Sequence, residues 1–360
     1  SVLPMLCASV MPATGVVQLE NVPHLQDVTT TTRLLTQMGV SVTMDEFMNI
    51  SLDPSAIDNF YAPYDLVKTM RSSILVLGPL LSRFGEAKVS LPGGCAIGLR
   101  PVDMHLKALK KMGAEIKVER GYITAQSKRL KGANITFEKK TVTGTENIIM
   151  AASLAKGLTK INNAANEPEI SDLCLFLNKM GAKISGHGTD MIEIDGVEVL
   201  RGTIHKPLPD RIEAGTFMIA AAITRGDVEI NNIVPNHSFA VIEKLIEAGA
   251  EITSNDNSIR VKMRQRPKAV DIETNAYPFF PTDMQAQMTA LNAVAKGDSY
   301  VRENIFENRF MHVQELERMG ASIKVNDNIA KISGAKKLLA APVMATDLRA
   351  SASLILAGLA

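Results

Sequence analysis

The pattern of apolar and polar positions along the chain repeats about every seventy residues. The segments QMGVSV, KMGAEIKV, KMGAKIS, EAGAEIT and RMGASIKV each place a glycine after an amphipathic run and before alternating residues. These glycines, at positions 39, 113, 181, 249 and 320, are 74, 68, 68 and 71 residues apart. Such a pattern predicts a helix, a C-cap glycine and then a strand in every unit.

A second series of glycines runs in phase with the first. It consists of Gly15, Gly85, Gly157, Gly226 and Gly297, which are 70, 72, 69 and 71 residues apart. Most of them follow a run of small and apolar residues, such as AGTFMIAAAITRG, and precede a short strand pattern such as DVEINN. Each unit is therefore predicted to contain strand, helix, strand, helix and strand, and stacked units form repeated α/β modules.

The prolines suggest where two groups of units meet. Five units occupy the chain, and a sixth glycine corner would fall about 70 residues after Gly320. The segment HKPLPDR (205–211) lies between the third and fourth units and carries two prolines that interrupt regular structure. We therefore expect domains at residues 1–208 and 209–360. The start without Met and the apolar end SASLILAGLA lead us to expect a fragment.

Composition excludes several classes of partner. The chain is 46% hydrophobic and 21% charged, and its 39 basic and 38 acidic residues leave a net charge of only +1. There is thus no overall field that would attract nucleic acid or an acidic membrane surface. Aromatic residues make up 4% and tryptophan is absent, which argues against base stacking. No apolar run reaches the roughly 20 residues of a membrane-spanning helix.

The three cysteines are widely spaced and belong to no CxxC or Cys/His cluster, so neither a disulfide framework nor a zinc site is supported. A reduced, cytoplasmic setting fits best. Cys7 and Cys174 lie in apolar helical patterns and are expected in the core. Cys95 lies in LPGGCAIGLRP with Arg100, just before a helical pattern that begins at Pro101. Amides at a helix N-terminus lower a thiol pKa, so Cys95 is either a reactive thiol or a small residue in a turn.

Three motifs in the second half carry candidate site residues. Asp283 in FFPTDMQAQ is either an N-cap or a carboxylate base. In ENIFENRFMH, Arg309 is a ligand candidate, whereas His312 is more typical of a structural histidine. In MATDLRAS, Asp347 is a natural N-cap, and Arg349 is either a ligand or a solvated side chain.

The first half offers weaker signals. KTMRSS is predicted to put Lys68 and Arg71 one helical turn apart, and EKKTVTGTEN (138–147) is a polar loop before a helix that could cradle phosphate. Glu167 and Glu169 have no histidine or third carboxylate nearby in sequence, so a metal role is not supported. Walker A, GxGxxG, GxSxG and HExxH motifs are absent from the sequence.

Taken together, these motifs resemble the UDP-N-acetylglucosamine 1-carboxyvinyltransferases, enolpyruvyl transferases that open bacterial peptidoglycan synthesis. The resemblance runs through essentially the whole chain and is carried by APYDLVKTMRSS, LPGGCAIGLRPVDMH, FPTDMQAQ, IFENRFMHV and ATDLRASASL. It implies an inside-out α/β barrel fold in which six βαβαββ units form two similar domains with a cleft between them. This chain would then lack the N-terminal strand and the last repeat of the second domain.

The resemblance also implies a reaction. Enolpyruvyl would pass from phosphoenolpyruvate to the sugar 3′-hydroxyl through a tetrahedral intermediate, with release of phosphate and without metal or organic cofactor. Cys95 would donate a proton to the methylene carbon, and Asp283 would face the 3′-hydroxyl as base. Arg100 and Arg349 would clamp phosphoenolpyruvate. The full set of implied substrate-binding or supporting residues is Arg71, Arg100, Pro101, Val102, Asp103, Met104, Lys139, Lys140, Thr141, Val142, Ile305, Arg309, Asp347 and Arg349.

The family further implies a cytoplasmic bacterial monomer that serves cell-wall biogenesis, cell shape and division, and that fosfomycin inhibits. The chain departs from the usual pattern at Leu99, Met104 and Asn166, and the loop near Lys140 is uncertain by one residue in register. Two alternatives stay open at this point: a noncatalytic paralogue or inactive fragment that holds the nucleotide sugar, and a shikimate 3-phosphate enolpyruvyl transferase. Cys95 argues against the second, because that family lacks a cysteine in this loop.

Overall fold

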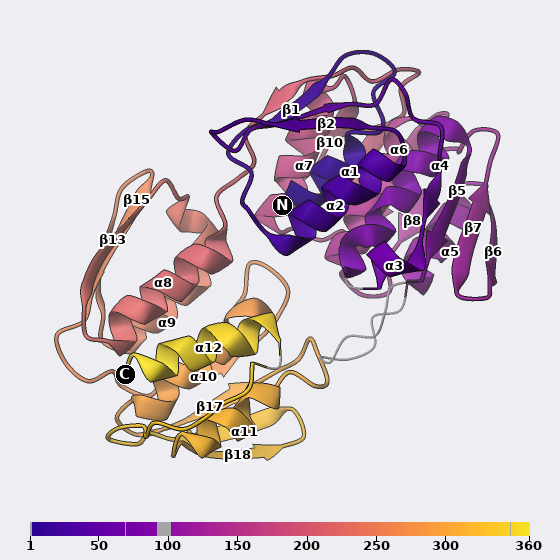
Figure 1. Cartoon of the computed structure of the whole chain (residues 1–360). Coiled ribbons are helices and arrows are strands. Elements are labelled where there is room, and N and C mark those ends of the chain that lie inside the picture. Colours follow the sequence, from indigo (N-terminus) through magenta and orange to yellow (C-terminus); the bar gives the residue numbers. More distant parts are fainter. Residues whose placement is uncertain (1, 69, 92–101, 346) are drawn as a thin grey trace. The chain divides into compact units, whose positions relative to one another are not determined.

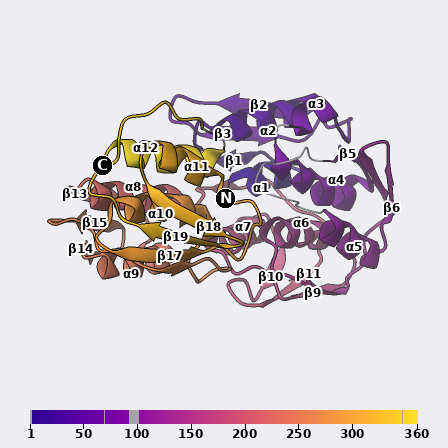
Figure 2. The same ribbon diagram turned by 90° about the horizontal axis from the view of Figure 1, so that it is seen from below.

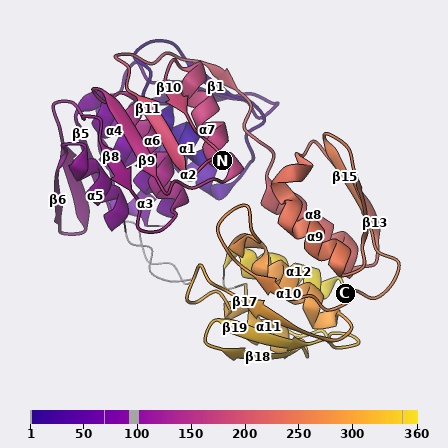
Figure 3. The same ribbon diagram turned by 180° about the vertical axis from the view of Figure 1, so that it is seen from behind.

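The computed structural model describes residues 2–68, 70–91, 102–345 and 347–360. Two compact units are present, one within residues 1–208 and one over Pro209–Ala360. Each unit carries its own hydrophobic core. Figures 1, 2 and 3 show the helices and sheets of both units from three directions.

The first unit contains three four-stranded sheets and several helices. Its helices are α1 (Val2–Ala8), α2 (Gln26–Gln37), α3 (Tyr64–Val67), the 3-10 helix η1 (Arg71–Val76), α4 (Leu77–Phe84), α5 (Asp103–Lys111), α6 (Val142–Ser153) and α7 (Pro168–Lys179). One sheet has the order β12 (Ile204–His205), β1 (Val17–Leu19), β3 (Ile50–Asp53) and β2 (Ser41–Met44). The next has the order β4 (Tyr61–Ala62), β5 (Glu86–Ser90), β7 (Tyr122–Gln126) and β6 (Glu115–Glu119). The last has the order β10 (Lys183–Ser185), β11 (Met191–Asp195), β9 (Leu158–Asn162) and β8 (Asn134–Thr136).

The second unit repeats this plan. Its helices are α8 (Arg211–Ile223), η2 (Pro235–Ser238), α9 (Phe239–Glu247), η3 (Thr282–Met284), α10 (Gln285–Val294), α11 (Met311–Arg318) and α12 (Leu348–Gly358). One sheet has the order β13 (Asp227–Asn231), β15 (Ser258–Lys262) and β14 (Glu251–Ser254). The other has the order β16 (Ile272–Glu273), β17 (Asp298–Arg302), β19 (Ile329–Ser333) and β18 (Ser322–Asn326).

The sheets share one construction. Three antiparallel strands come from a single repeat, and in each four-stranded sheet a short strand joins the first of them in parallel. In the first sheet that short strand is β12, so the last strand of the first unit lies beside β1. Each repeat that the glycine spacing predicts therefore corresponds to one sheet of the structure.

The backbone conformation of the two glycine series explains the period of about seventy residues. The first series, at 39, 113, 181, 249 and 320, has φ between 89° and 106°, a left-handed conformation that glycine adopts without a Cβ clash. The predicted C-caps are therefore confirmed. The second series is left-handed at four of its five positions. At Gly226 the preceding Arg225 takes the left-handed conformation instead, with φ 56°.

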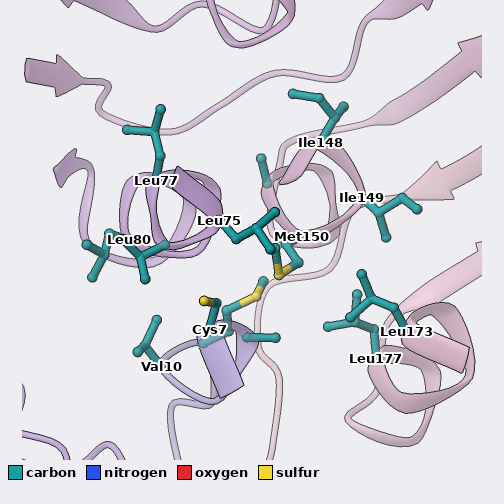
Figure 4. Close-up of a cluster of buried hydrophobic side chains, with 14 of the residues drawn as sticks. Cys7, Val10, Leu75, Leu77, Leu80, Ile148, Ile149, Met150, Leu173 and Leu177 are labelled. Carbon is teal, nitrogen blue, oxygen red and sulfur yellow. The ribbon is translucent and has the colours of Figure 1, made fainter. Parts of the chain in front are cut away.

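One helix in each unit is buried on all sides. In α6 every residue from Gly144 to Ser153 is buried, and in α10 the same holds from Gln285 to Val294. A helix that is buried all round packs in the interior of its unit, and polar side chains of these two helices, such as Asn147 and Asn292, are hydrogen-bonded there. Figure 4 shows Leu75, Met150 and Leu173 around α1, where the Cys7 side chain lies among apolar groups. Cys7 and Cys174 are both buried, as predicted.

Two helical predictions were wrong. The helix expected from Pro101 begins at Asp103 instead, with Val102 as its N-cap. Lys68 and Arg71 do not share a helix, because α3 ends at Val67 and Met70 is extended (φ −137°, ψ 110°) before η1 begins. Lys68 pairs with Asp65 at 2.8 Å on its own short helix.

Candidate active site

The second unit brings together three charged residues that are distant in sequence. Asp283 lies in η3, just before the buried helix α10, and its Oδ1 accepts a hydrogen bond from Arg309 Nη2 at 2.7 Å. Its Oδ2 accepts from Arg349 Nη2 at 3.3 Å. Arg309 precedes α11, and Arg349 lies in the first turn of α12. One carboxylate thus holds two guanidinium groups from two other segments.

The electrostatics of this cluster favour an ionised carboxylate. Burial of Asp283 opposes ionisation, but the positive charges of Arg349 and Arg309 outweigh it and lower the pKa of the carboxyl below 3.8. The side chain of Arg309 is only 5% exposed, while that of Asp283 is 41% exposed. The carboxylate is therefore charged at neutral pH and open to solvent on one side, as a group that accepts a proton from a ligand hydroxyl must be.

The structure excludes one of the two readings of Asp283. Neither η3 nor α10 receives a side-chain cap at its N-terminus, so the N-cap interpretation of Asp283 is wrong. Asp347, by contrast, is an N-cap as predicted, because its Oδ1 accepts from the backbone N–H groups of Arg349 at 2.8 Å and Ala350 at 3.1 Å. This cap stabilises the first turn of α12, which carries Arg349.

His312 is a buried residue of α11, three positions after Arg309 in the sequence. It is 1% exposed, and its pKa falls from 6.5 to about 4, chiefly because of burial. The negative charge of Asp347 raises this pKa, whereas Arg309 lowers it through its charge and raises it through a backbone hydrogen bond. The ring is neutral at pH 7, which agrees with the structural role expected from the sequence.

The predicted nucleotide-sugar loop lies at the start of α6 in the first unit. Thr141 is the N-cap and accepts from the Gly144 N–H at 3.2 Å, while Lys139 and Val142 are exposed. Lys140 is paired with Asp190, which also accepts from Asn166 Nδ2 at 2.8 Å. Lys140 and Asn166 both bond to Asp190. Asn166, where the chain departs from the usual pattern of the family, therefore lies beside this loop.

The run that opens α5 is anchored by a buried network. Val102 and Met104 pack against the core of the first unit, and Asp103 contacts Lys107 at 3.5 Å. His105, 3% exposed, places its Nδ1 3.1 Å from Asn147 Nδ2, and burial lowers its pKa to about 4. Asn147 also donates to the Ile74 carbonyl at 3.0 Å. One amide in α6 therefore holds both η1 and α5.

Several predicted positions lie outside the described part. These are Cys95, Arg100 and Pro101, together with Leu99 and the side chain of Arg71. Ile305 is 41% exposed, beside the loop that leads to Arg309. Two buried polar residues that lie inside the quoted motifs but were not proposed as site residues, Asn147 and Glu303, tie the segments of their units together.

No cluster of three or more His, Cys, Asp or Glu residues that could hold a metal ion is present in the described ranges. None of the helices described is both long and apolar enough to cross a membrane.

Comparison with known proteins gives one consistent family. A family model described as EPSP synthase (3-phosphoshikimate 1-carboxyvinyltransferase) matches residues 1–360. The chain is 60% identical over 358 residues to a UDP-N-acetylglucosamine 1-carboxyvinyltransferase of Hydrogenovibrio crunogenus, covering 99% of this chain and 85% of that protein. It is 58% identical over 361 residues to the protein of the same name from Coxiella burnetii, covering 100% and 83%.

Solved structures agree on the fold. The enolpyruvyl transferase NikO from Streptomyces tendae matches with a TM-score of 0.85 at 22% identity, covering 99% of this chain and 85% of that one. An EPSP synthase from Acinetobacter baumannii matches with a TM-score of 0.73 at 22% identity, covering 99% and 86%. At this identity the likeness shows the fold alone, which is the repeated α/β architecture predicted from the sequence.

Proposed function

The chain belongs to the EPSP synthase family and, within it, to the UDP-N-acetylglucosamine 1-carboxyvinyltransferases, and from this premise we propose its reaction. It transfers enolpyruvyl from phosphoenolpyruvate to the 3′-hydroxyl of UDP-N-acetylglucosamine and releases phosphate. The observation that carries the proposal is the 58–60% identity to transferases of that name over 99% or more of the chain. The ionised Asp283 between two arginines supports it independently.

In the addition step the sugar 3′-oxygen bonds to C2 of phosphoenolpyruvate while the double bond takes up a proton at C3. Asp283 accepts the hydroxyl proton, and the Cys95 thiol supplies the proton that turns the methylene into a methyl group. In the elimination step the C–O bond to phosphate breaks, the methyl group returns its proton to the Cys95 thiolate, the proton held by Asp283 leaves with the phosphate, and the double bond re-forms. Atoms and charge balance without an added cofactor.

The arginines supply positive charge where negative charge lies. Arg100 and Arg349 bind the carboxylate and phosphate of phosphoenolpyruvate, since planar fork-shaped donors suit both groups. Arg309, buried against Asp283, keeps that carboxylate ionised and oriented. In many enzymes, preorganised charge of this kind accelerates the reaction more than any other single effect when the transition state is anionic.

We assign binding of the nucleotide sugar to Arg71, to the run from Arg100 to Met104, to the loop from Lys139 to Val142, and to Ile305. Asp347 supports the site by fixing the start of α12. The reaction would be an early step of peptidoglycan synthesis in a bacterial cytoplasm, catalysed by a monomer and blocked by fosfomycin through Cys95.

Substrate discrimination tests the proposal. Phosphate release is measured with phosphoenolpyruvate plus either UDP-N-acetylglucosamine or shikimate 3-phosphate, and binding of each acceptor is measured by calorimetry. Release with the nucleotide sugar alone supports the proposal. Comparable release with shikimate 3-phosphate and none with the sugar overturns it. Binding of the sugar without any release supports the noncatalytic alternative.

A further inference from the structure

Glu303 is a buried carboxylate that joins three segments of the second unit. It is 3% exposed and follows β17. Its Oε1 accepts from Thr274 Oγ1 at 2.9 Å, from Ile305 N at 2.9 Å and from Phe306 N at 3.2 Å. Its Oε2 accepts from Thr282 Oγ1 at 2.9 Å. Four donors converge on one side chain, which offsets the cost of burying a carboxylate.

These segments are the ones that carry the charged cluster. Thr282 immediately precedes Asp283 in η3, and Ile305 and Phe306 open the loop that leads to Arg309. The Arg309 guanidinium stands 5.1 Å from the Phe306 ring centre, so the start and the end of this loop are in contact. Glu303 therefore ties the backbone beside Asp283 to the loop that carries Arg309, the arginine at the shorter distance from Asp283.

The second and fifth repeats, with Leu91 and Glu303, depart from the other three at this position. Six residues after the glycine of the second series, three repeats have an asparagine in a left-handed conformation: Asn21 (φ 52°), Asn163 (φ 55°) and Asn232 (φ 58°). Asparagine tolerates this conformation and closes a tight local turn. Glu303, six residues after Gly297, is not among the left-handed residues of the described chain, and its side chain turns inward. Beside the candidate site, Glu303 therefore takes the place of the asparagine turn that three other repeats have.

We propose that Glu303 is a positioning residue for the transferase reaction, which holds Asp283 and the Arg309 loop in register through its four hydrogen bonds. This inference rests on the proposed function. Glu303 itself touches no substrate and acts through the groups it orients. A displacement of about 1 Å between reacting groups costs on the order of 100-fold in rate, so the register matters for turnover.

The first test compares Glu303→Ala and Glu303→Gln with the control Asn292→Ala. Asn292 is a fully buried polar residue in α10 that bonds Val270 N at 3.1 Å and Val270 O at 2.9 Å, and it has no bond to the charged cluster among the described residues. The readout is the pKa of Asp283, followed by carboxyl 13C NMR, together with kcat for phosphate release from phosphoenolpyruvate and UDP-N-acetylglucosamine.

In Glu303→Ala we expect the pKa of Asp283 to rise towards its ordinary value and kcat to fall at least about 100-fold. Glu303→Gln keeps the shape and three acceptor contacts, so it should retain kcat within about tenfold. Asn292→Ala should lose stability. It should leave the pKa of Asp283 unchanged and kcat within about threefold of the parent value. Unchanged values in Glu303→Ala, or equal losses in Asn292→Ala, overturn the proposal.

A second variant covers the case in which Glu303→Ala does not fold. Thr282→Val keeps the side-chain volume and removes only the hydroxyl that donates to Glu303 Oε2. We expect a smaller rise in the pKa of Asp283 and a fall in kcat of about tenfold, and a folded Thr282→Val protein without either change overturns the proposal. The NMR titration needs no turnover, so absence of phosphate release from the parent protein refutes the proposed function while the role of Glu303 is still tested.

Discussion

Arg309 Nη2 lies 2.7 Å from Asp283 Oδ1, and this pair joins a side chain that is 5% exposed to one that is 41% exposed. The guanidinium is held inside the unit while the carboxylate reaches solvent. Removing the carboxylate therefore has two separable consequences, one for proton transfer and one for a buried cation that loses its partner.

Asp283→Asn tests both consequences. We expect kcat to fall about 100-fold or more, because an amide cannot accept the hydroxyl proton, and the free energy of unfolding to fall by roughly 1–3 kcal/mol. Steady-state phosphate release and urea unfolding measure the two effects. Asp298→Asn, which removes a surface carboxylate 3.5 Å from Lys331, serves as the control and should change neither. Full activity in Asp283→Asn would refute its role as base.

Arg349→Lys probes the anion clamp. Arg349 is 25% exposed and touches Asp283 with one nitrogen, which leaves the rest of its fork for a ligand anion. Lysine keeps the charge but not the fork, so KM for phosphoenolpyruvate should rise about 10- to 100-fold while KM for the nucleotide sugar changes little. Initial rates over both substrate concentrations give the answer. Equal increases in both KM values would contradict the assignment.

His312 predicts how stability depends on pH. Its pKa is 6.5 in the unfolded chain and about 4 in the folded protein, so the unfolded chain binds the proton first as the pH falls. Stability is therefore lost between pH 6.5 and 4, by up to about 1.4 kcal/mol per pH unit. His105 shows the same lowering in the first unit. His312→Gln should flatten the decline in urea-unfolding free energy over this range, and an identical slope in the variant would refute the prediction.

The buried cysteines predict a simple labelling pattern. Burial raises the pKa of Cys174 to about 12 and raises that of Cys7 as well, so neither forms a thiolate at neutral pH. Iodoacetamide should leave both unmodified in the folded protein, and only Cys95 is expected to react. Mass spectrometry of peptides from the parent and from Cys95→Ser measures this. Rapid modification of Cys7 or Cys174 without denaturant would contradict the burial.

Gly78 predicts a packing requirement between α4 and α6. Its N–H donates to Asn147 Oδ1 at 2.8 Å, and a Cβ at this position would overlap both the side-chain and the backbone oxygen of Asn147. Gly78→Ala should lower the free energy of unfolding by about 1–3 kcal/mol or more. Gly358→Ala is the control, since a Cβ there meets no neighbour within 4 Å. Equal stability of the two variants would show that α4 can move away.

The period of the fold could be predicted from the sequence because a glycine stands two residues after the end of one helix in every repeat. All five glycines of the first series are left-handed caps, and the sheets repeat with them. The exception at Gly226 could not be predicted, because Arg225 adopts the left-handed conformation without any compositional sign.

The site was harder to predict because its contacts are long-range. Asp283 satisfies the local pattern of an N-cap, and only the approach of Arg309 and Arg349, 26 and 66 residues away, shows that its carboxylate faces them instead. Asp347 satisfies the same pattern and is a cap. Glu303 was missed because its partners lie on three segments, although its departure from the asparagines of three other repeats could have indicated it.

The most direct measurement follows C2 of phosphoenolpyruvate, the carbon that exchanges its bond to the phosphate oxygen for a bond to the sugar 3′-oxygen. The protein is incubated with [2-13C]phosphoenolpyruvate and UDP-N-acetylglucosamine, and the products are identified by 13C NMR and mass spectrometry. The proposed reaction predicts a labelled enol ether on the 3′-oxygen of the sugar together with one equivalent of phosphate. Labelled pyruvate as the sole product, or label on shikimate 3-phosphate but never on the nucleotide sugar, would contradict it.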